Sequence, residues 1–593
     1  MVVIMRRSDL IDVIYGRKNA DIFIKNGILV NVITGEIYET NVAILGDRIA
    51  YVGDFFDGID RDTLIIDADN KYLVPGFIDT HQHSYETHVN MTEYAKILLQ
   101  HGTTVVSEAF YGMGLVAGKR AVEQCLKELK ATPLNVLFFL PIMAYIQNRE
   151  LGLEPVPGSI TQEDLLEMLE WPECKGLEEP PYIPIIEKDK FFIDLFEKAI
   201  SLGKVITGHA SGCDIRGLNA YAAMGASSDH ESTNAQEAID RMRLGIRMSM
   251  REGSGASDVV NIVKSITENK ISPNFYMYCG DEVEFLRIVE KGHLDYNIKL
   301  TINSGVNPVD AIRMATINAA EYFRISDDFG SICPGKIANV VIVNNLFDFD
   351  VETVISKGEI IIRDNKLIKD SKLPEYQDFM YQTMKIKRFI NKEDIKVKVN
   401  TDSSNVKINV IGVEDGSLIS RKLVMEIGLI NGIVNPDINQ DILKIVMLDR
   451  YNRWEKPSVG FISGTNLKEG AIGTTYDPLY ENILVVGTND EDICLAVNEI
   501  AKMGGGFIAV KNNKVVGKLE LPLFGLLSDK KIESIVPTMK SLYSEIEKMG
   551  CTLKKGPFHT LGFMAVCGEI GDLKLSHKGI FDVNERKVID LVV

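Results

Sequence analysis

Two histidines separated by one residue follow an apolar segment near the start of the chain. His81 and His83 come after Tyr72-Leu73-Val74-Pro75-Gly76-Phe77-Ile78. Side chains two residues apart in a β-strand lie on one face, so both imidazoles would project from the end of a buried strand. Imidazole binds Zn, Fe, Mn and similar ions, and catalytic metal sites keep open positions beside their protein ligands. Because the chain has only 9 histidines in 593 residues, this pair favours a metal site over two unrelated histidines in a turn.

More potential ligands follow apolar segments later in the chain. His209 ends the run Val205-Ile206-Thr207-Gly208-His209, and His230 lies in Ser228-Asp229-His230-Glu231. Asp281 comes just after the apolar segment Phe275–Cys279. For any one of these residues, a place in an ordinary loop is an equally good interpretation. Together, four histidines and an acid that each follow a strand predict one shared site.

A cluster of histidines and carboxylates around divalent metals suits hydrolysis. One or two metal ions would lower the pKa of a water molecule toward about 7 and supply hydroxide at neutral pH. A carboxylate, for which Asp281 is the candidate, would take the water's proton and pass it to a leaving nitrogen. Asp229 and Glu231, on either side of His230, would orient this histidine or hydrogen-bond to the substrate.

A second metal ion needs an anionic ligand from the middle of the same region. Glu178 and Glu179 are the candidates by position. The alternative is that both belong to an exposed acidic loop, since Glu173 lies nearby, and their spacing leaves both interpretations open. Histidine and carboxylate ligands accept Zn, Mn and Fe alike, so the type of metal also stays open.

Residues 76–329 alternate between strand-like and helical segments. Over about 250 residues this alternation predicts a (β/α)8 barrel, whose active site lies at the C-terminal ends of the strands. The expected strands include Thr103–Ser107, Asn135–Pro141, Lys204–Gly208, Tyr221–Ser228 and Phe275–Cys279. The expected helices include Thr92–Gln100, Lys119–Lys130, Thr161–Leu169, Lys190–Leu202, Asn234–Met248 and Pro308–Phe323.

The segments on either side of this region predict two further domains. Residues 1–75 and 330–380 both consist of short strands and turns, so we expect them to form one composite β-sandwich around the inserted barrel. Residues 381–593 mix strands and helices without the barrel's repeat and predict a C-terminal α+β domain. Within it, Gly504-Gly505-Gly506 lies between a helix and a strand, which favours a helix C-cap and turn over a phosphate loop.

The composition argues against several classes of protein. Its 45% apolar and 25% charged residues are ordinary for a soluble globular protein. A net charge of −18 argues against nucleic-acid or anionic-membrane surfaces, which need basic patches. No apolar stretch approaches the length of about 20 residues that a membrane helix needs, and no signal-peptide core is evident. The 8 scattered cysteines, without a Cys-x-x-Cys pair, indicate reduced thiols and a cytoplasmic protein.

Taken together, these motifs resemble those of the adenine deaminases in the amidohydrolase superfamily, over nearly the whole chain. The resemblance is carried by Pro75-Gly76-Phe77-Ile78-Asp79-Thr80-His81-Gln82-His83, His101-Gly102-Thr103-Thr104, Gly208-His209-Ala210, Ser228-Asp229-His230-Glu231, Arg251-Glu252-Gly253-Ser254 and, in the last domain, Val486-Gly487-Thr488-Asn489-Asp490.

The resemblance implies a metal-dependent (β/α)8 barrel that holds two divalent ions (Mn, Fe or Zn) and acts on a purine base. It assigns His81 and His83 as ligands from the first strand, Glu179 as the bridging glutamate, His209 and His230 as ligands from the fifth and sixth strands, and Asp281 as the catalytic aspartate and a further metal ligand. Family members convert adenine and water to hypoxanthine and ammonia. We also expect a homo-oligomer, most simply a dimer.

Several motifs around the expected substrate depart from the family's pattern. His-Ile-Glu-Ser is replaced by His83-Ser84-Tyr85-Glu86, Asp-Pro-His-Glu by Glu108-Ala109-Phe110-Tyr111, and Cys-Thr-Asp-Asp by Cys279-Gly280-Asp281-Glu282. In the last domain, Arg-His-His and His-Asp-Ser-His become Arg450-Tyr451-Asn452 and Tyr476-Asp477-Pro478-Leu479-Tyr480. The metal ligands are therefore kept while much of the surrounding polar shell differs.

Three functions follow from this pattern. The first is deamination of adenine, with Glu231 or Asp229 helping to hold the purine. The second is opening of a ring amide in an oxidised purine such as xanthine, whose carbonyl and N–H groups would be bound by tyrosine hydroxyls such as Tyr85 and Tyr111, with Tyr451 and Tyr476 as further candidates. The third, a catalytically inactive binding or scaffold protein, is the least favoured because every residue of the expected metal site is retained.

Overall fold

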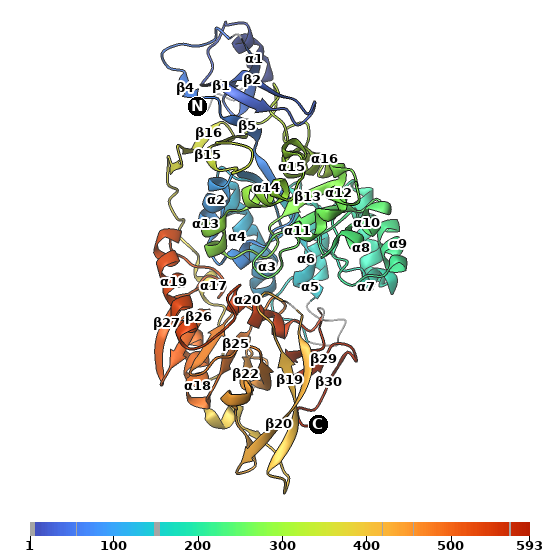
Figure 1. The fold of residues 1–593 in the computed structure, drawn as a ribbon, viewed down its shortest axis with the longest axis vertical. Helices are drawn as coiled ribbons and strands as arrows, with labels where there is room; N and C mark the ends of the chain where they lie inside the picture. Colours follow the sequence, from blue (N-terminus) through green and yellow to red (C-terminus); the bar gives the residue numbers. More distant parts are fainter. Residues whose placement is uncertain (1–5, 55, 147–153, 418, 455, 569–570) are drawn as a thin grey trace.

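The computed structural model describes residues 6–54, 56–146, 154–417, 419–454, 456–568 and 571–593. Along the long axis of the molecule lie a flanking β-sheet, a barrel and a C-terminal domain (Figure 1). Within these residues, no helix is both long enough and apolar enough to span a membrane.

Parallel strands form a (β/α)8 barrel, as predicted. A five-stranded and a three-stranded parallel sheet compose it, and a parallel bridge between Ile206 and Ala226 joins them. The ring closes where the Thr80 N–H donates to the Tyr278 carbonyl oxygen at 3.2 Å. The strands are β6 (Phe77–Asp79), β7 (Thr103–Glu108), β8 (Asn135–Pro141), β9 (Cys174–Glu178), β10 (Val205–Ile206), β11 (Ser228–Asp229), β12 (Arg247–Arg251) and β13 (Tyr276–Cys279).

Amphipathic helices cover the outside of the barrel. In α4 the buried residues Ala121, Cys125 and Leu129 recur every four positions and form the face toward the barrel. Lys127 and Lys130 lie in the last turn, where their positive charges interact favourably with the negative end of the helix dipole. The barrel helices are α2 (Met91–Gln100), α3 (Tyr111–Ala117), α4 (Lys119–Lys130), α5 (Ile142–Ile146), α6 (Gln162–Leu169), α7 (Ile183–Ile186), α8 (Lys190–Ser201), α9 (Ile215–Ala223), α10 (Ala235–Arg243), α11 (Val259–Ile262), α12 (Lys264–Thr267), α13 (Phe285–Lys291), α14 (Leu294–Asn303), α15 (Pro308–Ala315) and α16 (Ile317–Tyr322).

Three sequence-based element boundaries in this region were wrong. The apolar run Tyr221–Ser228 is not one strand, because its first residues complete helix α9 and the strand begins only at Ser228. The expected helix Asn234–Met248 ends at Arg243, since Gly245 adopts a φ of 82° and turns the chain into strand β12. The expected helix Pro308–Phe323 is divided at Thr316, whose φ of −133° and ψ of −92° are not helical.

A single nine-stranded sheet combines the two segments that flank the barrel. Its order is β17-β16-β15-β14-β5-β1-β2-β3, with β4 paired to β1. The two segments join where β5 and β14 run antiparallel, with Pro75 opposite Val340 and Tyr72 opposite Val343. Helix α1 (Arg7–Ile14) packs on one face. The strands are β1 (Ile22–Val30), β2 (Ile37–Leu45), β3 (Arg48–Gly53), β4 (Leu64–Asp67), β5 (Tyr72–Pro75), β14 (Val340–Val343), β15 (Val351–Ser356), β16 (Glu359–Arg363) and β17 (Lys366–Leu367).

The C-terminal domain is α+β, with a ten-stranded sheet in the order β18-β21-β20-β19-β23-β22-β25-β24-β26-β27 and a three-stranded sheet β28-β29-β30. As predicted, the triple glycine follows a helix, α18, and precedes a strand, β26. The strands are β18 (Val397–Lys398), β19 (Asn405–Gly412), β20 (Arg421–Ile430), β21 (Ile433–Val434), β22 (Leu443–Leu448), β23 (Ser458–Ser463), β24 (Ala471–Thr474), β25 (Ile483–Gly487), β26 (Gly506–Lys511), β27 (Lys514–Glu520), β28 (Leu573–Ser576), β29 (Gly579–Asp582) and β30 (Lys587–Val588). The helices are α17 (Asp378–Tyr381), α18 (Asp490–Lys502), α19 (Ile532–Lys548) and α20 (Pro557–Gly562).

Buried hydrogen bonds connect the C-terminal domain to the barrel. Helix α20 lies on the side of the C-terminal domain that faces the barrel (Figure 1). The Ser528 N–H donates to the His88 carbonyl oxygen at 2.9 Å, and the Asn90 side-chain amide donates to the Ser528 carbonyl oxygen at 3.1 Å. The Tyr543 hydroxyl of α19 donates to the carboxylate of Glu284, the residue that precedes α13 of the barrel. The two domains therefore share a desolvated interface.

Glu284 is expected to make the stability of this interface depend on pH. Burial raises its pKa to about 7. The folded protein therefore binds the proton of Glu284 more tightly than the unfolded protein does. The free energy of unfolding falls as the pH rises from the ordinary pKa of a glutamate through the raised value of the folded state. Between pH 5 and 8, wild-type protein should lose about 2 kcal/mol that Glu284→Gln retains.

Thermal unfolding midpoints of both proteins at the two pH values measure this loss. The matched control is Glu290→Gln, because the Glu290 carboxylate is about half exposed and pairs with Lys540 at 2.9 Å. Since the charge of Glu290 adds a smaller contribution than burial to the raised pKa of Glu284, this control should gain only a part of the effect. If Glu290→Gln exceeded wild-type protein in stability at pH 8 by as much as Glu284→Gln does, the role of burial would be contradicted.

Candidate metal centre and active site

The C-terminal ends of the barrel strands bring all six predicted metal-site residues together. His81 and His83 follow β6, Glu179 follows β9, and Asp281 follows β13. His209 and His230 follow β10 and β11 in the same way. Glu179 is only 4% exposed. This burial agrees with a place in the metal site and excludes the alternative of an exposed acidic loop. This is the end of a (β/α)8 barrel at which catalytic groups lie.

Glu179 lies at the centre of the cluster. Its Oε2 is 3.4 Å from His81 Nε2, 3.4 Å from His209 Nδ1 and 3.6 Å from His230 Nε2. Its other oxygen, Oε1, is 3.3 Å from His83 Nε2. The residue adopts a φ of 35°, in the left-handed region, and its N–H donates to the Thr207 hydroxyl at 2.8 Å. One carboxylate thus faces four imidazoles, and this strained backbone is of the kind found at functional sites.

Asp281 approaches the first histidine pair from the opposite side. Its Oδ1 is 3.4 Å from His81 Nε2 and 3.5 Å from His83 Nε2. Its backbone fixes this position, because its N–H donates to the His81 carbonyl oxygen at 2.9 Å and its own carbonyl oxygen accepts from the His83 N–H at 3.2 Å. Burial alone would raise the pKa of Asp281, but His81, His230 and Arg251 hold it well below its usual range.

The donor set suits the binding of divalent metal ions. His81, His83 and Asp281 form one group of ligand atoms within 4.8 Å of one another, and His81, Glu179 and His230 form a second. His81 Nε2 is buried without a hydrogen-bond partner among the described residues, as expected of an atom reserved for a metal. Imidazoles and carboxylates in this proportion suit Zn, Mn or Fe.

Glu231 connects the histidines to an arginine that the sequence analysis did not single out as functional. Glu231 Oε1 is 3.1 Å from His230 Nε2 and 2.7 Å from Arg251 Nη1. Arg251 Nη1 also donates to Asp281 Oδ2 at 3.1 Å. Burial opposes ionisation of Glu231, but the charge of Arg251 holds its pKa well below the usual range. Arg251 ends β12, and from sequence it was quoted only as the first residue of the motif Arg251-Glu252-Gly253-Ser254, without a role.

Asp229 was predicted to contact substrate, but its carboxylate is occupied within the protein. Its Oδ1 accepts from the Ala210 N–H at 2.7 Å, and its Oδ2 accepts from Arg241 Nε at 2.5 Å and from the Glu231 N–H at 3.1 Å. It is absent from the described residues that line the cavity beside the metal cluster. These contacts support the other role considered for Asp229, which is to orient the segments carrying His209 and His230.

Asp229→Asn is expected to destabilise the protein by about 2–4 kcal/mol, because it leaves the buried Arg241 charge without its anion. Asp240→Asn is the matched control, since Asp240 pairs with Arg243 at 3.2 Å on the surface and such pairs contribute at most about 1 kcal/mol. Urea denaturation followed by circular dichroism measures both effects. Equal losses in the two variants would show that Asp229 has no special structural role.

Tyr85 and Tyr111, the other predicted substrate-binding residues, do line the cavity. Their rings meet edge to face, with centroids 5.3 Å apart, and the Tyr85 hydroxyl has no hydrogen-bond partner among the described residues. Tyr451 differs, because its hydroxyl donates to the Tyr480 carbonyl oxygen at 2.7 Å. Neither Tyr451 nor Tyr476 is among the described residues of the lining.

Other lining residues were missed by sequence reasoning. Glu86, which is buried, and Glu282, which is partly buried, contribute two further carboxyl groups. The C-terminal domain covers the cavity with apolar side chains, namely Pro478, Leu479, Phe563 and Val566. Glu86 and Glu282 stand next to predicted site residues in the sequence, which was a usable signal. The four apolar residues carry none, because only the tertiary fold brings them to the barrel.

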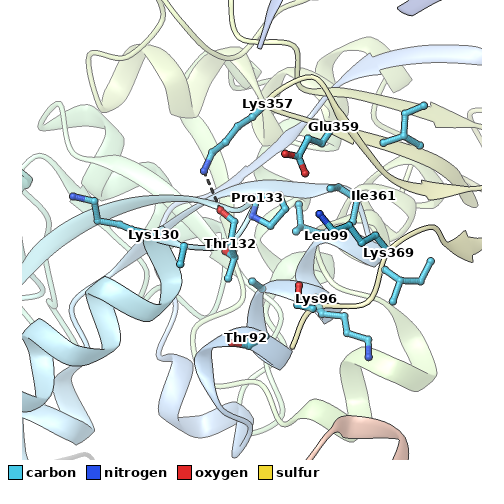
Figure 2. A pocket seen from close by; sticks show the side chains of 15 residues that line it. Thr92, Lys96, Leu99, Lys130, Thr132, Pro133, Lys357, Glu359, Ile361 and Lys369 are labelled. Carbon is cyan, nitrogen blue, oxygen red and sulfur yellow. Dashed lines mark hydrogen bonds between the residues drawn. The ribbon is translucent and has the colours of Figure 1, made fainter. Parts of the chain in front are cut away.

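A second cavity lies between the barrel and the flanking sheet and is lined by four lysines, Lys96, Lys130, Lys357 and Lys369 (Figure 2). Lys357 Nζ donates to the carbonyl oxygens of Thr132 at 3.2 Å and Leu134 at 3.0 Å. Lys96 Nζ pairs with Glu533 at 2.5 Å and also with Glu93 and Asp370, each at 3.3 Å. The metal-site residues do not line this cavity. Lys357 thus links the flanking sheet to the barrel, and Lys96 links the barrel to the C-terminal domain.

Comparisons with known proteins agree with this architecture. Residues 72–361 match the amidohydrolase family, and residues 417–587 match the adenine deaminase C-terminal domain. The chain is 31% identical to an adenine deaminase of Moorella thermoacetica over 98% of each chain. It is 32% identical to an adenine deaminase of Thermosipho africanus, over 99% of this chain and 100% of that protein. The chain therefore belongs to the adenine deaminase family of the amidohydrolases.

Proposed function

We propose that the protein is a metal-dependent hydrolase that converts adenine and water to hypoxanthine and ammonia. The observation that carries the proposal is the cluster of four imidazoles around Glu179 at the C-terminal end of the barrel, beside a cavity. The similarity to adenine deaminases over the full chain supports adenine as the substrate.

The proposed ligands of two divalent ions are His81, His83, Glu179, His209, His230 and Asp281. When bound, such ions would lower the pKa of a water molecule and so provide a nucleophile at neutral pH. Manganese, iron and zinc all fit these donors, and elemental analysis of purified protein distinguishes them. A homodimer, which light scattering would test, and a cytoplasmic location remain predictions.

Asp281 is proposed to move the proton during catalysis. Its carboxylate, held ionised between His81 and Arg251, would accept a proton from the attacking water as the C6–O bond forms. It would then deliver that proton to the C6 amino group, so that the C6–N bond breaks and ammonia leaves. Glu231 lines the cavity and is held by Arg251, which suits it to hydrogen-bond to the purine next to the reacting carbon.

A second candidate is the opening of a ring amide in an oxidised purine such as xanthine. The observation that favours it is the buried Tyr85 hydroxyl, which lines the cavity without a partner among the described residues and could donate to a ring carbonyl. The same metal centre would serve either reaction, because both add water at a ring carbon that is bonded to nitrogen.

Incubation of metal-loaded protein with adenine and with xanthine tests the proposal. Release of ammonia together with formation of hypoxanthine supports adenine deamination. Loss of purine absorbance with xanthine alone supports ring opening and contradicts deamination. Absence of turnover with either purine, in protein that elemental analysis shows to bind no metal, would leave an inactive binding or scaffold protein.

A further inference from the structure

Two hydroxyl groups, those of Tyr221 and Thr207, lie between the chain segments that carry Glu179 and His209. Tyr221 belongs to the last turn of α9, and its side chain is fully buried. Its hydroxyl accepts from the His209 N–H at 3.1 Å and donates to the Pro180 carbonyl oxygen. One buried oxygen atom therefore joins the residue after Glu179 to His209 itself.

The backbone pairing of β9 and β10 ends just before these two residues. The Thr207 N–H still donates to the Leu177 carbonyl oxygen at 3.1 Å, as in a parallel ladder. The Glu179 N–H, with its residue at a φ of 35°, donates to the Thr207 hydroxyl at 2.8 Å. Pro180 and Pro181 then have no N–H to donate. Side-chain hydroxyls thus connect the two segments where their ligands leave the sheet.

The ring of Tyr221 is packed so tightly that its hydroxyl has a fixed place. A Cβ atom on Gly208 would lie 3.0 Å from Cε1 of the Tyr221 ring and 2.4 Å from the Ser228 carbonyl oxygen. Only glycine allows this close approach, so the chain just before His209 rests on the ring. The Phe196 ring lies beside Tyr221, with centroids 6.5 Å apart. A rigid side chain therefore sets the position of the backbone atoms that its hydroxyl binds.

This bridge bears on one part of the proposed metal site. Glu179 Oε2 and His209 Nδ1 are 3.4 Å apart, and both residues belong to the bridged segments. The ligand group of His81, His83 and Asp281 comes from the ends of β6 and β13. Those two ends are joined to each other, since the Asp281 N–H donates to the His81 carbonyl oxygen at 2.9 Å. The two ligand groups are therefore positioned by separate contacts.

We infer that Tyr221 is a positioning residue for the metal ion bound by Glu179 and His209. Its hydroxyl sets the separation of these two ligands, and the Thr207 hydroxyl is a second contact between the same segments. The inference rests on the proposed two-ion site. It adds that the affinity for one ion depends on a residue that does not touch it. Without the hydroxyl, the His209 N–H and the Pro180 carbonyl oxygen lose a buried partner, so the segments can shift.

Tyr221→Phe tests the inference, because it removes the hydroxyl and keeps the ring. Metal-free, full-length protein is titrated with Co²⁺, whose visible absorption depends on the number and geometry of its ligands. For wild-type protein we expect two binding steps. In the variant, one step should weaken at least about tenfold and its absorption bands should change, whereas the other step should stay within about threefold.

Tyr276→Phe is the matched control. Tyr276 is also fully buried, and its hydroxyl lies 2.5 Å from the Ser265 hydroxyl. It is the first residue of β13, at the end of the strand opposite to Asp281. The thermal unfolding midpoint of the metal-free protein should fall by similar amounts in Tyr221→Phe and Tyr276→Phe, because each loses one buried hydrogen-bonding hydroxyl. The control should nevertheless bind Co²⁺ like wild-type protein.

Unchanged Co²⁺ binding in Tyr221→Phe, or equal weakening of both steps, would overturn the inference. If circular dichroism shows that this variant is unfolded, Thr207→Val replaces it under the same criterion, because valine keeps the branched shape without the hydroxyl. Failure of the proposed two-ion site gives a different result, a single binding step in wild-type protein. In that case a loss of at least about tenfold for this one ion in Tyr221→Phe supports the inference, and an unchanged affinity overturns it as well.

Discussion

Glu179→Gln is expected to reduce bound divalent metal from about two ions per chain to about one or fewer, and to lower adenine turnover by at least about 1,000-fold. The reason is that this single carboxylate contacts all four histidines, with its two oxygens divided between His83 and the other three. Glutamine keeps the shape of the side chain but removes the negative charge that two adjacent cations require. Plasma mass spectrometry of the purified protein measures the metal, and ammonia release measures turnover.

The neighbouring residue provides the matched control. Glu178 is also buried, at 2% exposure, and one of its oxygens lies within 4.8 Å of ligand atoms of His83 and Glu179. Its one described ion pair, however, is with a single histidine, Oε1 to His81 Nδ1 at 3.8 Å. Glu178→Gln should therefore keep about two ions and lose no more than about tenfold in turnover, as for residues that orient a ligand without binding the metal. Equal metal loss in both variants would mean that the site responds to total charge, and the bridging role of Glu179 would have to be abandoned.

Asp281→Asn should lower turnover by about 100- to 10,000-fold, the range that a positioned acid or base contributes. Asparagine preserves an oxygen toward His81 and His83 but cannot carry the proton from water to the leaving nitrogen. At least one ion should remain bound, since Glu179 and the histidines are untouched. Stopped assays with adenine, paired with metal analysis of the same preparation, separate loss of proton transfer from loss of metal.

Asp258→Asn is the control for a change of charge near the same arginine. Its Oδ2 is 3.3 Å from Arg251 Nη2, comparable with the 3.1 Å between Asp281 Oδ2 and Arg251 Nη1. Unlike Asp281, it belongs to none of the described groups of possible metal ligands. A loss below about tenfold is expected for this variant. Near-normal activity in Asp281→Asn would remove Asp281 from the acid–base role.

Much of the site could be predicted from sequence because most of the ligands come within a few residues of an apolar segment, and the barrel gathers the ends of its strands at one face. His81 and His83 could be predicted as a pair of ligands from one rule, that side chains two residues apart in a strand lie on the same face. His209, His230 and Asp281 needed the barrel's alternation of strands and helices. For Glu179 the sequence left an exposed acidic loop as the alternative, because Glu173 and Glu178 are close by and the preceding strand is not a run of apolar residues.

The parts that could not be predicted depend on contacts between distant segments. Strand β12 (Arg247–Arg251) was missed because the expected helix was continued to Met248, past the turn at Gly245. Arg251 was quoted only as part of a family motif, because its contacts with Glu231 and Asp281 arise only in the fold. Asp229 was expected to contact the substrate because it adjoins His230, but its carboxylate is paired with Arg241, which lies twelve residues away in the sequence. The apolar cover formed by Leu479 and Phe563 comes from a domain whose position no local pattern reveals.

The pairing of β5 with β14 has a consequence for how the protein is made. Leu73 hydrogen-bonds within the sheet to a partner strand centred on Ile342, and the entire barrel lies between them in the chain. A ribosome adding about 5–20 residues per second would leave β5 without this neighbour for on the order of tens of seconds. During that interval one edge of a Val- and Ile-rich sheet stays open to other chains. Binding of a chaperone to the nascent chain before residue 340 emerges should therefore decide how much enzyme reaches the folded state.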